Sequence, residues 1–271
     1  MLQERLQAQR FEYKYVISED TAAAVRDFVR SYLRPDEYAA VRPDFSYPVH
    51  SLYLDSVPLT TYWDTINGNL NRYKLRLRFY SAHPESPVFF EIKQRMNDAV
   101  LKQRSGVRRE AVAWLLSGHL PNVSQLISGN PNQLAALDQF CLRMNRIGAV
   151  PQARVSYQRE AWAGEGKHGI RLTMDRAVRL EPDSTARLAE EMRNPVEVFG
   201  QNVVLELKFD DQYPDWVNEM VRVFGLVRGS AAKYVDGVAL IGEERVTGFR
   251  HQTFDPRDEE HLNARRQALA T

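Results

Sequence analysis

The sequence predicts an α+β fold in which about eight antiparallel strands close into a barrel tunnel with a charged lumen and amphipathic helices packed outside. Three observations support this prediction. Segment 72–79 strictly alternates cationic and apolar residues. The tripeptide Glu-apolar-Lys recurs on three predicted strands, at 12–14, 91–93 and 206–208. Several predicted helices have one apolar face. If these helices cover the apolar faces of the strands, the charged faces point into the barrel.

Segment 72–79 is the clearest strand. Successive side chains of a strand point to opposite faces, so Arg72, Lys74, Arg76 and Arg78 share one face. Like charges on one face repel each other unless water or an anion lies against them. Taken alone, the segment is more simply an amphipathic strand with a solvated basic face. The other strands change this interpretation because they carry the same pattern.

The first half of the chain begins with a predicted strand at 10–17 and a helix that Ser18 caps and Pro35 ends. Alternation with a period of two predicts further strands at 49–55, 72–79, 88–95 and 99–108, and apolar residues at helical spacing predict helices at 58–65, 110–116 and 133–146. Short connections between the last three strands predict an antiparallel meander.

The second half repeats this organisation. We expect strands at 152–162, 170–175 and 203–209, and helices at 214–224 and from about residue 231. Segment 181–200 is charged, contains two prolines and is predicted to be a flexible connection. Residues 1–9 and 247–271 are polar, and we expect them to flank a single domain at 10–246 as a lead-in and a tail.

Composition limits the classes of function. The chain has 36 Lys and Arg against 35 Asp and Glu, so a basic site must be a local concentration of charge, and nucleic-acid binding is not indicated. The single Cys141 excludes an intramolecular disulfide and is expected to be buried. The sequence has no signal-like region and no apolar run of about 18 residues. We therefore expect a cytoplasmic protein without a membrane span.

The charged face of the strands indicates the type of ligand. About ten cations in a confined lumen repel each other strongly unless a polyanion or interleaved carboxylates offset them. Arginine offers phosphate a bidentate contact and lysine a mobile charge, so a mixed lining suits a chain of phosphates. The glutamates cannot bind phosphate directly. We expect them to hold a hard divalent cation that bridges to phosphate oxygens.

Several of these segments resemble a known family. In this order along the chain, five segments resemble the VTC-type polyphosphate polymerase domain of the CYTH, or triphosphate tunnel metalloenzyme, superfamily: Arg10-Phe11-Glu12-Tyr13-Lys14-Tyr15, Lys74-Leu75-Arg76-Leu77-Arg78, Phe90-Glu91-Ile92-Lys93, Leu205-Glu206-Leu207-Lys208 and Lys233-Tyr234. The resemblance covers nearly the whole chain. It implies an eight-stranded antiparallel tunnel that transfers the terminal phosphate of a nucleoside triphosphate to a growing polyphosphate, with Mn²⁺ or Mg²⁺.

The resemblance also implies roles for individual residues. Phosphate ligands in the reaction would be Lys14, Arg76, Arg78, Lys93, Arg154, Arg171 and Lys233. Further substrate contacts would come from Arg10, Lys74, Arg104 and Lys208. The main metal ligand would be Glu206, with Glu12 and Glu91 as second choices. Arg10 stands where triphosphatases of the superfamily have a glutamate, which favours the polymerase. Ala232 stands where the family has a serine, so one hydroxyl donor to phosphate is missing.

Three functions are open at this point. The chain could be a polyphosphate polymerase, a hydrolase of triphosphate or nucleoside triphosphate, or a polyanion-binding module without catalysis. The first two use the same phosphate clamp and metal, and differ in whether phosphate or water accepts the phosphoryl group. In each case the expected partners are nucleoside triphosphate and polyphosphate rather than nucleic acid.

Overall fold

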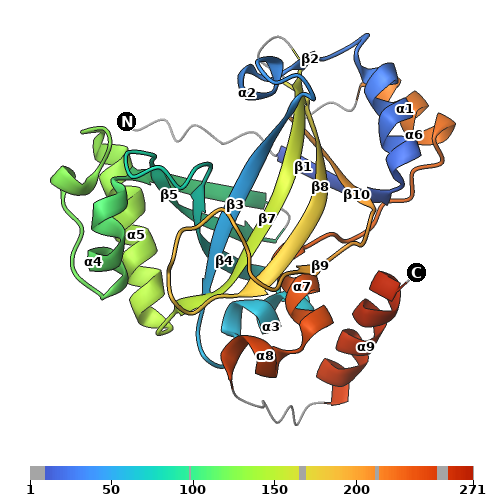
Figure 1. Cartoon of the computed structure of the whole chain (residues 1–271). Helices are drawn as coiled ribbons and strands as arrows, with labels where there is room; N and C mark the ends of the chain where they lie inside the picture. Colours follow the sequence, from blue (N-terminus) through green and yellow to red (C-terminus); the bar gives the residue numbers. More distant parts are fainter. Residues whose placement is uncertain (1–9, 98, 165–168, 211–213, 249–255, 271) are drawn as a thin grey trace, which may run out of the picture. The chain divides into compact units, whose positions relative to one another are not determined.

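The computed structural model describes residues 10–97, 99–164, 169–210, 214–248 and 256–270 (Figure 1). The strands, in chain order, are β1 (Arg10–Ile17), β2 (Arg34–Pro35), β3 (Ser46–Asp55), β4 (Asn71–Phe79), β5 (Val88–Met96), β6 (Ala99–Val107), β7 (Val150–Ala163), β8 (Arg171–Pro182), β9 (Val196–Glu197) and β10 (Val203–Asp210). The helices are α1 (Glu19–Val29), α2 (Glu37–Ala40), α3 (Thr60–Ile66), α4 (Val112–Leu116), α5 (Pro131–Arg146), α6 (Asp215–Val223), α7 (Lys233–Ile241), α8 (Glu243–Thr247) and α9 (Pro256–Ala270), with the short 3-10 helices η1 (Arg109–Ala111) and η2 (Val123–Gln125).

The strands form one large sheet, which is open. Their order is β1-β10-β8-β7-β3-β4-β5-β6, with β2 paired to β7 and β9 to β8. Within the described residues, β1 and β6 end this order and do not pair with each other. The predicted closed barrel is therefore wrong, because closure requires backbone hydrogen bonds between the two terminal strands. The α+β class and the antiparallel meander β4-β5-β6 are confirmed.

The described residues fall into two compact units, which we consider separately. The first contains the described parts of 1–47, 158–177 and 199–231, and the second those of 48–157, 178–198 and 232–271. Strands β3, β7 and β8 therefore contribute residues to both units.

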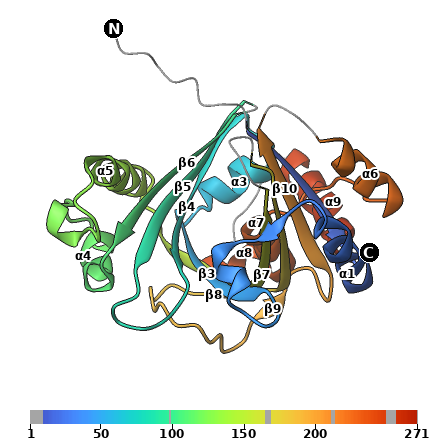
Figure 2. The same ribbon diagram turned by 90° about the horizontal axis from the view of Figure 1, so that it is seen from above.

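In the first unit, α1 and α6 cover the apolar face of β1, β10 and β8 (Figure 2). Ser18 begins α1, and its hydroxyl accepts a hydrogen bond from the Thr21 N–H, as expected for an N-cap. Strand and helix residues share one buried cluster, which includes Tyr15, Leu172, Leu205 and Leu207 of the sheet, Val25 and Val29 of α1, and Val217 and Met220 of α6. The helix ends before Pro35, which pairs instead with Trp162 as part of β2.

In the second unit, α4 and α5 pack on the apolar face of β4, β5 and β6 (Figure 2). The shared buried cluster includes Leu75, Leu77, Phe90 and Ile92 of the strands, Leu115 of α4, and Leu137, Phe140 and Met144 of α5. Cys141 is buried in this cluster as predicted, and burial raises the pKa of its thiol to about 11. In the part of the chain that the structure describes, no helix has the length and apolar character needed to cross a membrane.

Candidate functional site

The polar face of β4, β5 and β6 in the second unit gathers cations from all three strands. Arg76 of β4 pairs with Glu91 of β5, and Glu91 pairs with Arg104 of β6. Residues paired across an antiparallel sheet place their side chains on the same face. By register and alternation, the described cations on this face are Arg72, Lys74, Arg76, Arg78, Lys93, Arg95, Lys102 and Arg104. The structure therefore brings together on this face five of the eleven cations that the sequence analysis assigned to the site, namely Lys74, Arg76, Arg78, Lys93 and Arg104.

Glu91 is completely buried and lies at the centre of this cluster. Its Oε2 accepts from Arg76 Nε at 2.8 Å and lies 2.7 Å from Arg76 Nη2 and 4.0 Å from Arg78 Nε. Its Oε1 lies 2.8 Å from Lys102 Nζ and 3.5 Å from Arg104 Nε. Burial acts to raise the pKa of Glu91, but Arg76, Arg78 and Lys102 outweigh it and hold this pKa well below its usual range. One carboxylate thus faces four cations, and positive charge remains in excess.

Two tyrosines hold the arginine side chains in the same cluster. Arg76 Nη1 donates to Tyr53 Oη at 3.2 Å, and Arg78 Nη2 donates to Tyr157 Oη at 3.0 Å. Lys233, the first residue of α7, places its Nζ 5.1 Å from the centre of the Tyr157 ring. Residues from β3, β4, β7 and α7 therefore converge here, as expected for a preorganised binding site.

Lys102 is a lysine of this cluster whose pKa is clearly lowered. Loss of hydration lowers its pKa, Arg76 and Arg78 lower it further, and attraction to Glu91 offsets only part of this, so that the pKa is about 8. The sequence-based site omitted Lys102. The signal that could have found it is its alternation with Arg104 on β6.

The polar face of the first unit carries charges of both signs. Across β1 and β10, Glu12 pairs with Lys208 and Lys14 pairs with Glu206, and Lys208 pairs in turn with Arg171 of β8. Along the strands, Lys14 Nζ lies 3.2 Å from Glu12 Oε1, and Lys208 Nζ lies 2.8 Å from Glu206 Oε1. Carboxylates and ammonium groups alternate in both directions, so charge is more nearly balanced here than in the second unit.

A model of the VTC domain family matches residues 9–241, which is most of the chain. The chain belongs to the VTC domain family. This result confirms the resemblance drawn from the strand motifs, whereas none of the curated proteins compared with the chain matches it. Two solved structures resemble it at a distance. A provisionally named adenylate cyclase from Bacillus halodurans is 10% identical with a TM-score of 0.44, and 83% of this chain and 94% of that chain are covered. A protein from Pyrococcus horikoshii is 13% identical with a TM-score of 0.43, and 84% and 96% are covered.

Glu12 and Glu206 are the carboxylates of this VTC domain that fit a divalent cation. They are diagonal neighbours on adjacent strands, about 7 to 8 Å apart, so both side chains can reach one ion. Carboxylate oxygens are the ligands that Mg²⁺ and Mn²⁺ prefer. Glu91 does not fit, because four cations already surround its two oxygens. Among the described residues no group of three His, Cys, Asp or Glu could hold a metal, so substrate oxygens would have to complete the shell.

Arg159 belongs to the polar face of the first unit, although the sequence-based site omitted it. Its Nε and Nη2 each donate at 2.7 Å to one oxygen of the buried Asp175. Asp175 shares its face with Thr173, which pairs with Glu206. Arg159 therefore lies on the face that carries the glutamates. The sequence signal that could have found Arg159 is that it lies two residues from Tyr157 on β7 and therefore shares its face.

Arg154 is not brought together with these cations. It is fully buried, and its Nη2 donates to Glu181 Oε1 at 2.9 Å and to the Glu191 carbonyl at 2.8 Å. Its Nη1 donates to the Ala189 carbonyl. Because Arg154 and Tyr157 have opposite parity on β7, Arg154 points away from the face on which Tyr157 contacts Arg78. We interpret Arg154 as the anchor of the segment after β8 and do not retain it as a phosphate ligand.

The remaining predicted residues lie on the polar faces with individual partners. Arg171 Nη2 donates to Asp36 Oδ2 at 2.7 Å, and Lys74 Nζ donates to Thr65 Oγ1 at 2.7 Å. Arg10 begins β1 and pairs with Asp210, but its side chain lies outside the described part of the structure.

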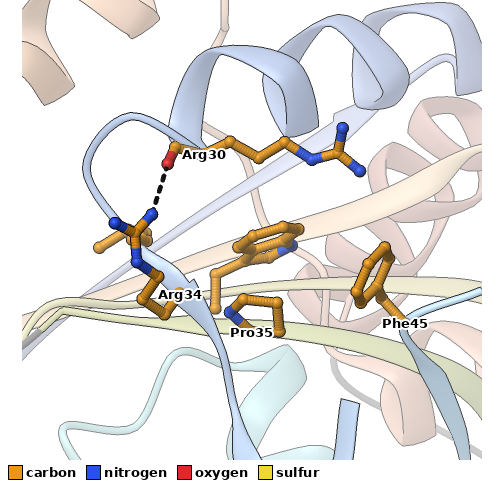
Figure 3. A pocket seen from close by; sticks show the side chains of 6 residues that line it. Arg30, Arg34, Pro35 and Phe45 are labelled. Atoms are coloured by element: carbon orange, nitrogen blue, oxygen red, sulfur yellow. Dashed lines mark hydrogen bonds between the residues drawn. The ribbon is translucent and has the colours of Figure 1, made fainter. Parts of the chain in front are cut away.

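A small apolar pocket lies elsewhere in the first unit (Figure 3). Its lining includes Arg30, Arg34, Phe45 and Trp162, and Arg34 Nη1 donates to the Arg30 carbonyl at 3.1 Å. Trp162 belongs to the apolar cluster under α1 and has the opposite parity to Arg159 on β7. The pocket therefore lies on the apolar side of the sheet and is separate from the charged faces.

Proposed function

We propose that this VTC domain is a metal-dependent phosphoryl transferase that binds nucleoside triphosphate and polyphosphate and lengthens the polyphosphate chain. The observation that carries the proposal is the cluster of Arg76, Arg78, Lys102 and Arg104 around the single carboxylate of Glu91. Phosphoryl transfer requires little covalent chemistry from a protein. It requires positioned phosphates and fixed positive charge where negative charge develops.

The residues of the cluster suit this task. The bonds of Arg76 to Glu91 and Tyr53 leave further N–H donors of its guanidinium for phosphate oxygens. Lys74, Lys93 and Lys233 would add mobile charges along the phosphate chain. In the first unit, Glu12 and Glu206 would hold Mn²⁺ or Mg²⁺, which would neutralise charge on the phosphate oxygens. The arginine at position 10, in place of a glutamate, favours the polymerase over a triphosphatase.

The direct test is incubation of the purified protein with ATP and Mn²⁺, followed by separation of the products. Phosphate recovered as long chains would support the polymerase. Phosphate released only as orthophosphate would replace this proposal with a hydrolase. No turnover, together with tight binding of tripolyphosphate, would make the chain a binding module.

Glu206→Gln is expected to keep the fold and to remove most of the metal-dependent turnover. An amide is a much poorer ligand for a hard cation than a carboxylate, so turnover should require far more Mn²⁺. The measurement is the rate of ATP consumption as a function of Mn²⁺ concentration. Glu197→Gln is the matched control, since Glu197 is half-exposed and its ion pair with the equally exposed Arg179 is weak. A wild-type Mn²⁺ dependence in Glu206→Gln would refute the metal assignment.

Binding of tripolyphosphate is expected to weaken by about tenfold as the pH rises through about 8, because Lys102 loses its proton and one charge-assisted bond is lost. Calorimetric titrations between pH 7 and 9 measure this step. Lys102→Arg keeps its charge over this pH range, so the pH-dependent loss of binding should disappear in this variant. The pKa of Lys102 in the folded state lies below its unfolded value of 10.5, so its contribution to the free energy of unfolding rises between about pH 8 and 10.5. Unfolding therefore cannot cause the expected loss of binding in this pH range. An identical pH profile in Lys102→Arg would assign the titration to another group.

A further inference from the structure

Asp55, the last residue of β3, is completely buried, and its carboxylate accepts hydrogen bonds from the first turn of α3. Its Oδ1 accepts the N–H groups of Ser56 at 2.8 Å and Thr61 at 2.9 Å. Its Oδ2 accepts the Thr61 hydroxyl at 2.8 Å and the Tyr62 N–H at 3.0 Å. Residue Leu59 at the N-cap position of α3 supplies no side-chain bond, and Asp55 instead accepts from the N–H groups of Thr61 and Tyr62 in the first turn of this helix.

A series of contacts through two aromatic rings connects Asp55 to Arg76. Its Oδ2 accepts a hydrogen bond from Tyr234 Oη at 3.2 Å. The Tyr234 ring stacks on the Tyr53 ring, with centroids 4.7 Å apart and planes 9° from parallel. Tyr53 Oη in turn accepts from Arg76 Nη1 at 3.2 Å. Contacts therefore run without a break from the start of α3, through the second residue of α7, to the guanidinium of Arg76.

The two hydroxyl groups lie in opposite electrostatic surroundings. Burial acts to raise the pKa of Tyr53, but the charges of Arg76 and Arg78 lower it below its usual value. Burial and the charge of Asp55 raise the pKa of Tyr234. Two phenylalanines would fill the same space without the cost of burying hydroxyl groups. The hydroxyls therefore have a use beyond core packing: one meets the cations and the other meets the carboxylate.

We propose that Tyr53 and Tyr234 are positioning residues, which fix the orientation of the Arg76 guanidinium and link it to the start of α7, where Lys233 stands. The proposal rests on the phosphate-binding role of Arg76 proposed above. Arg76 bonds Glu91 through Nε and Nη2 and bonds Tyr53 through Nη1, so its plane cannot rotate and its remaining donors keep one direction. A guanidinium that is already oriented binds phosphate with a smaller loss of side-chain freedom.

Tyr53→Phe tests the first link, because it keeps the ring and its stacking and removes one oxygen atom. We expect tripolyphosphate to bind about five- to tenfold more weakly and kcat for ATP to fall by a similar factor, while the melting temperature without ligand changes little. Tyr32→Phe is the matched control, because Tyr32 is exposed and its ring stacks on Trp216 in the first unit. It should bind tripolyphosphate as the wild type does.

The same substitution in an Arg76→Ala background distinguishes positioning from other roles. If Tyr53 acts through Arg76, Tyr53→Phe should have no further effect on tripolyphosphate binding once Arg76 is absent. Effects that multiply fully in the double variant would overturn the proposal. Tyr234→Phe tests the second link and should give a smaller loss of binding than Tyr53→Phe, because the ring that supports Tyr53 remains. Tyr234→Leu removes this ring and should match or exceed the loss in Tyr53→Phe, and tight binding by this variant would exclude the second link.

A measurement without ligand separates this inference from the proposed function. In ¹⁵N-arginine NMR spectra, a guanidinium that cannot rotate gives distinct Nη–H signals, and we expect them for Arg76 in the wild type. They should average in Tyr53→Phe. Unchanged Arg76 signals in this variant would overturn the positioning role, whether or not the protein turns over ATP. If the wild type binds neither tripolyphosphate nor ATP, the proposed function fails, and these spectra still decide whether Tyr53 orients Arg76.

Discussion

Arg76→Ala and Arg78→Ala are each expected to reduce the turnover of ATP by about a hundredfold or more. Removing one preorganised donor from a charge-stabilising site costs about 2 to 4 kcal/mol of transition-state stabilisation, and about 1.4 kcal/mol corresponds to a factor of ten. Hydrogen bonds to the hydroxyls of Tyr53 on β3 and Tyr157 on β7 orient the two guanidiniums, so alanine removes a donor that is already positioned. The measurement is kcat with saturating ATP and Mn²⁺.

Two further variants show whether this loss is specific. Arg179→Ala removes a half-exposed arginine of the second unit and should leave turnover unchanged. Arg76→Lys keeps the charge but cannot bond Glu91 and Tyr53 together, so it should recover only a small part of the activity. If Arg76→Ala melts well below the wild type while its tripolyphosphate-induced shift is unchanged, Arg76 is only a structural partner of Glu91.

The cation cluster on β4, β5 and β6 could be predicted from the sequence because local rules determine it. Strict alternation fixes which side chains share a face, and short connections make successive strands neighbours. These two rules suffice to bring Arg76, Glu91 and Arg104 onto one face. They do not show that Glu91 is completely buried among four cations, because burial depends on side-chain directions across three strands.

Closure of the sheet and the place of Arg154 could not be predicted in the same way. Closure depends on accumulated twist and stagger across all strands, which no local pattern encodes. Arg154 looked like one more strand cation, but its partners are Glu181 and backbone carbonyls of the segment that we expected to be a flexible connection. A charged side chain on a strand can point to either face when a distant segment supplies acceptors. Parity identifies the two faces of a strand but not which of them holds the site.

Glu91→Gln is expected to lower the free energy of unfolding by about 3 to 5 kcal/mol at neutral pH. The amide keeps the size of the side chain but removes the negative charge that lies within 4.0 Å of Arg76, Arg78, Lys102 and Arg104. The melting temperature should fall by roughly 10 °C. Urea unfolding of the two proteins measures the difference, and Glu197→Gln, at an exposed ion pair, should change stability by less than about 1 kcal/mol.

The difference between wild type and Glu91→Gln should depend on pH. The folded pKa of Glu91 is far below its unfolded value of 4.5, so its stabilisation is fully present above that value and is lost as the pH falls further. The difference in the free energy of unfolding between the two proteins should therefore be the same at pH 7 and pH 5 and smaller at pH 3.5. Tripolyphosphate should raise the melting temperature of Glu91→Gln more than that of the wild type, because its oxyanions replace the missing carboxylate. Equal stability at neutral pH would show that these cations do not depend on Glu91. A smaller ligand shift in the variant would show that phosphate binds away from them.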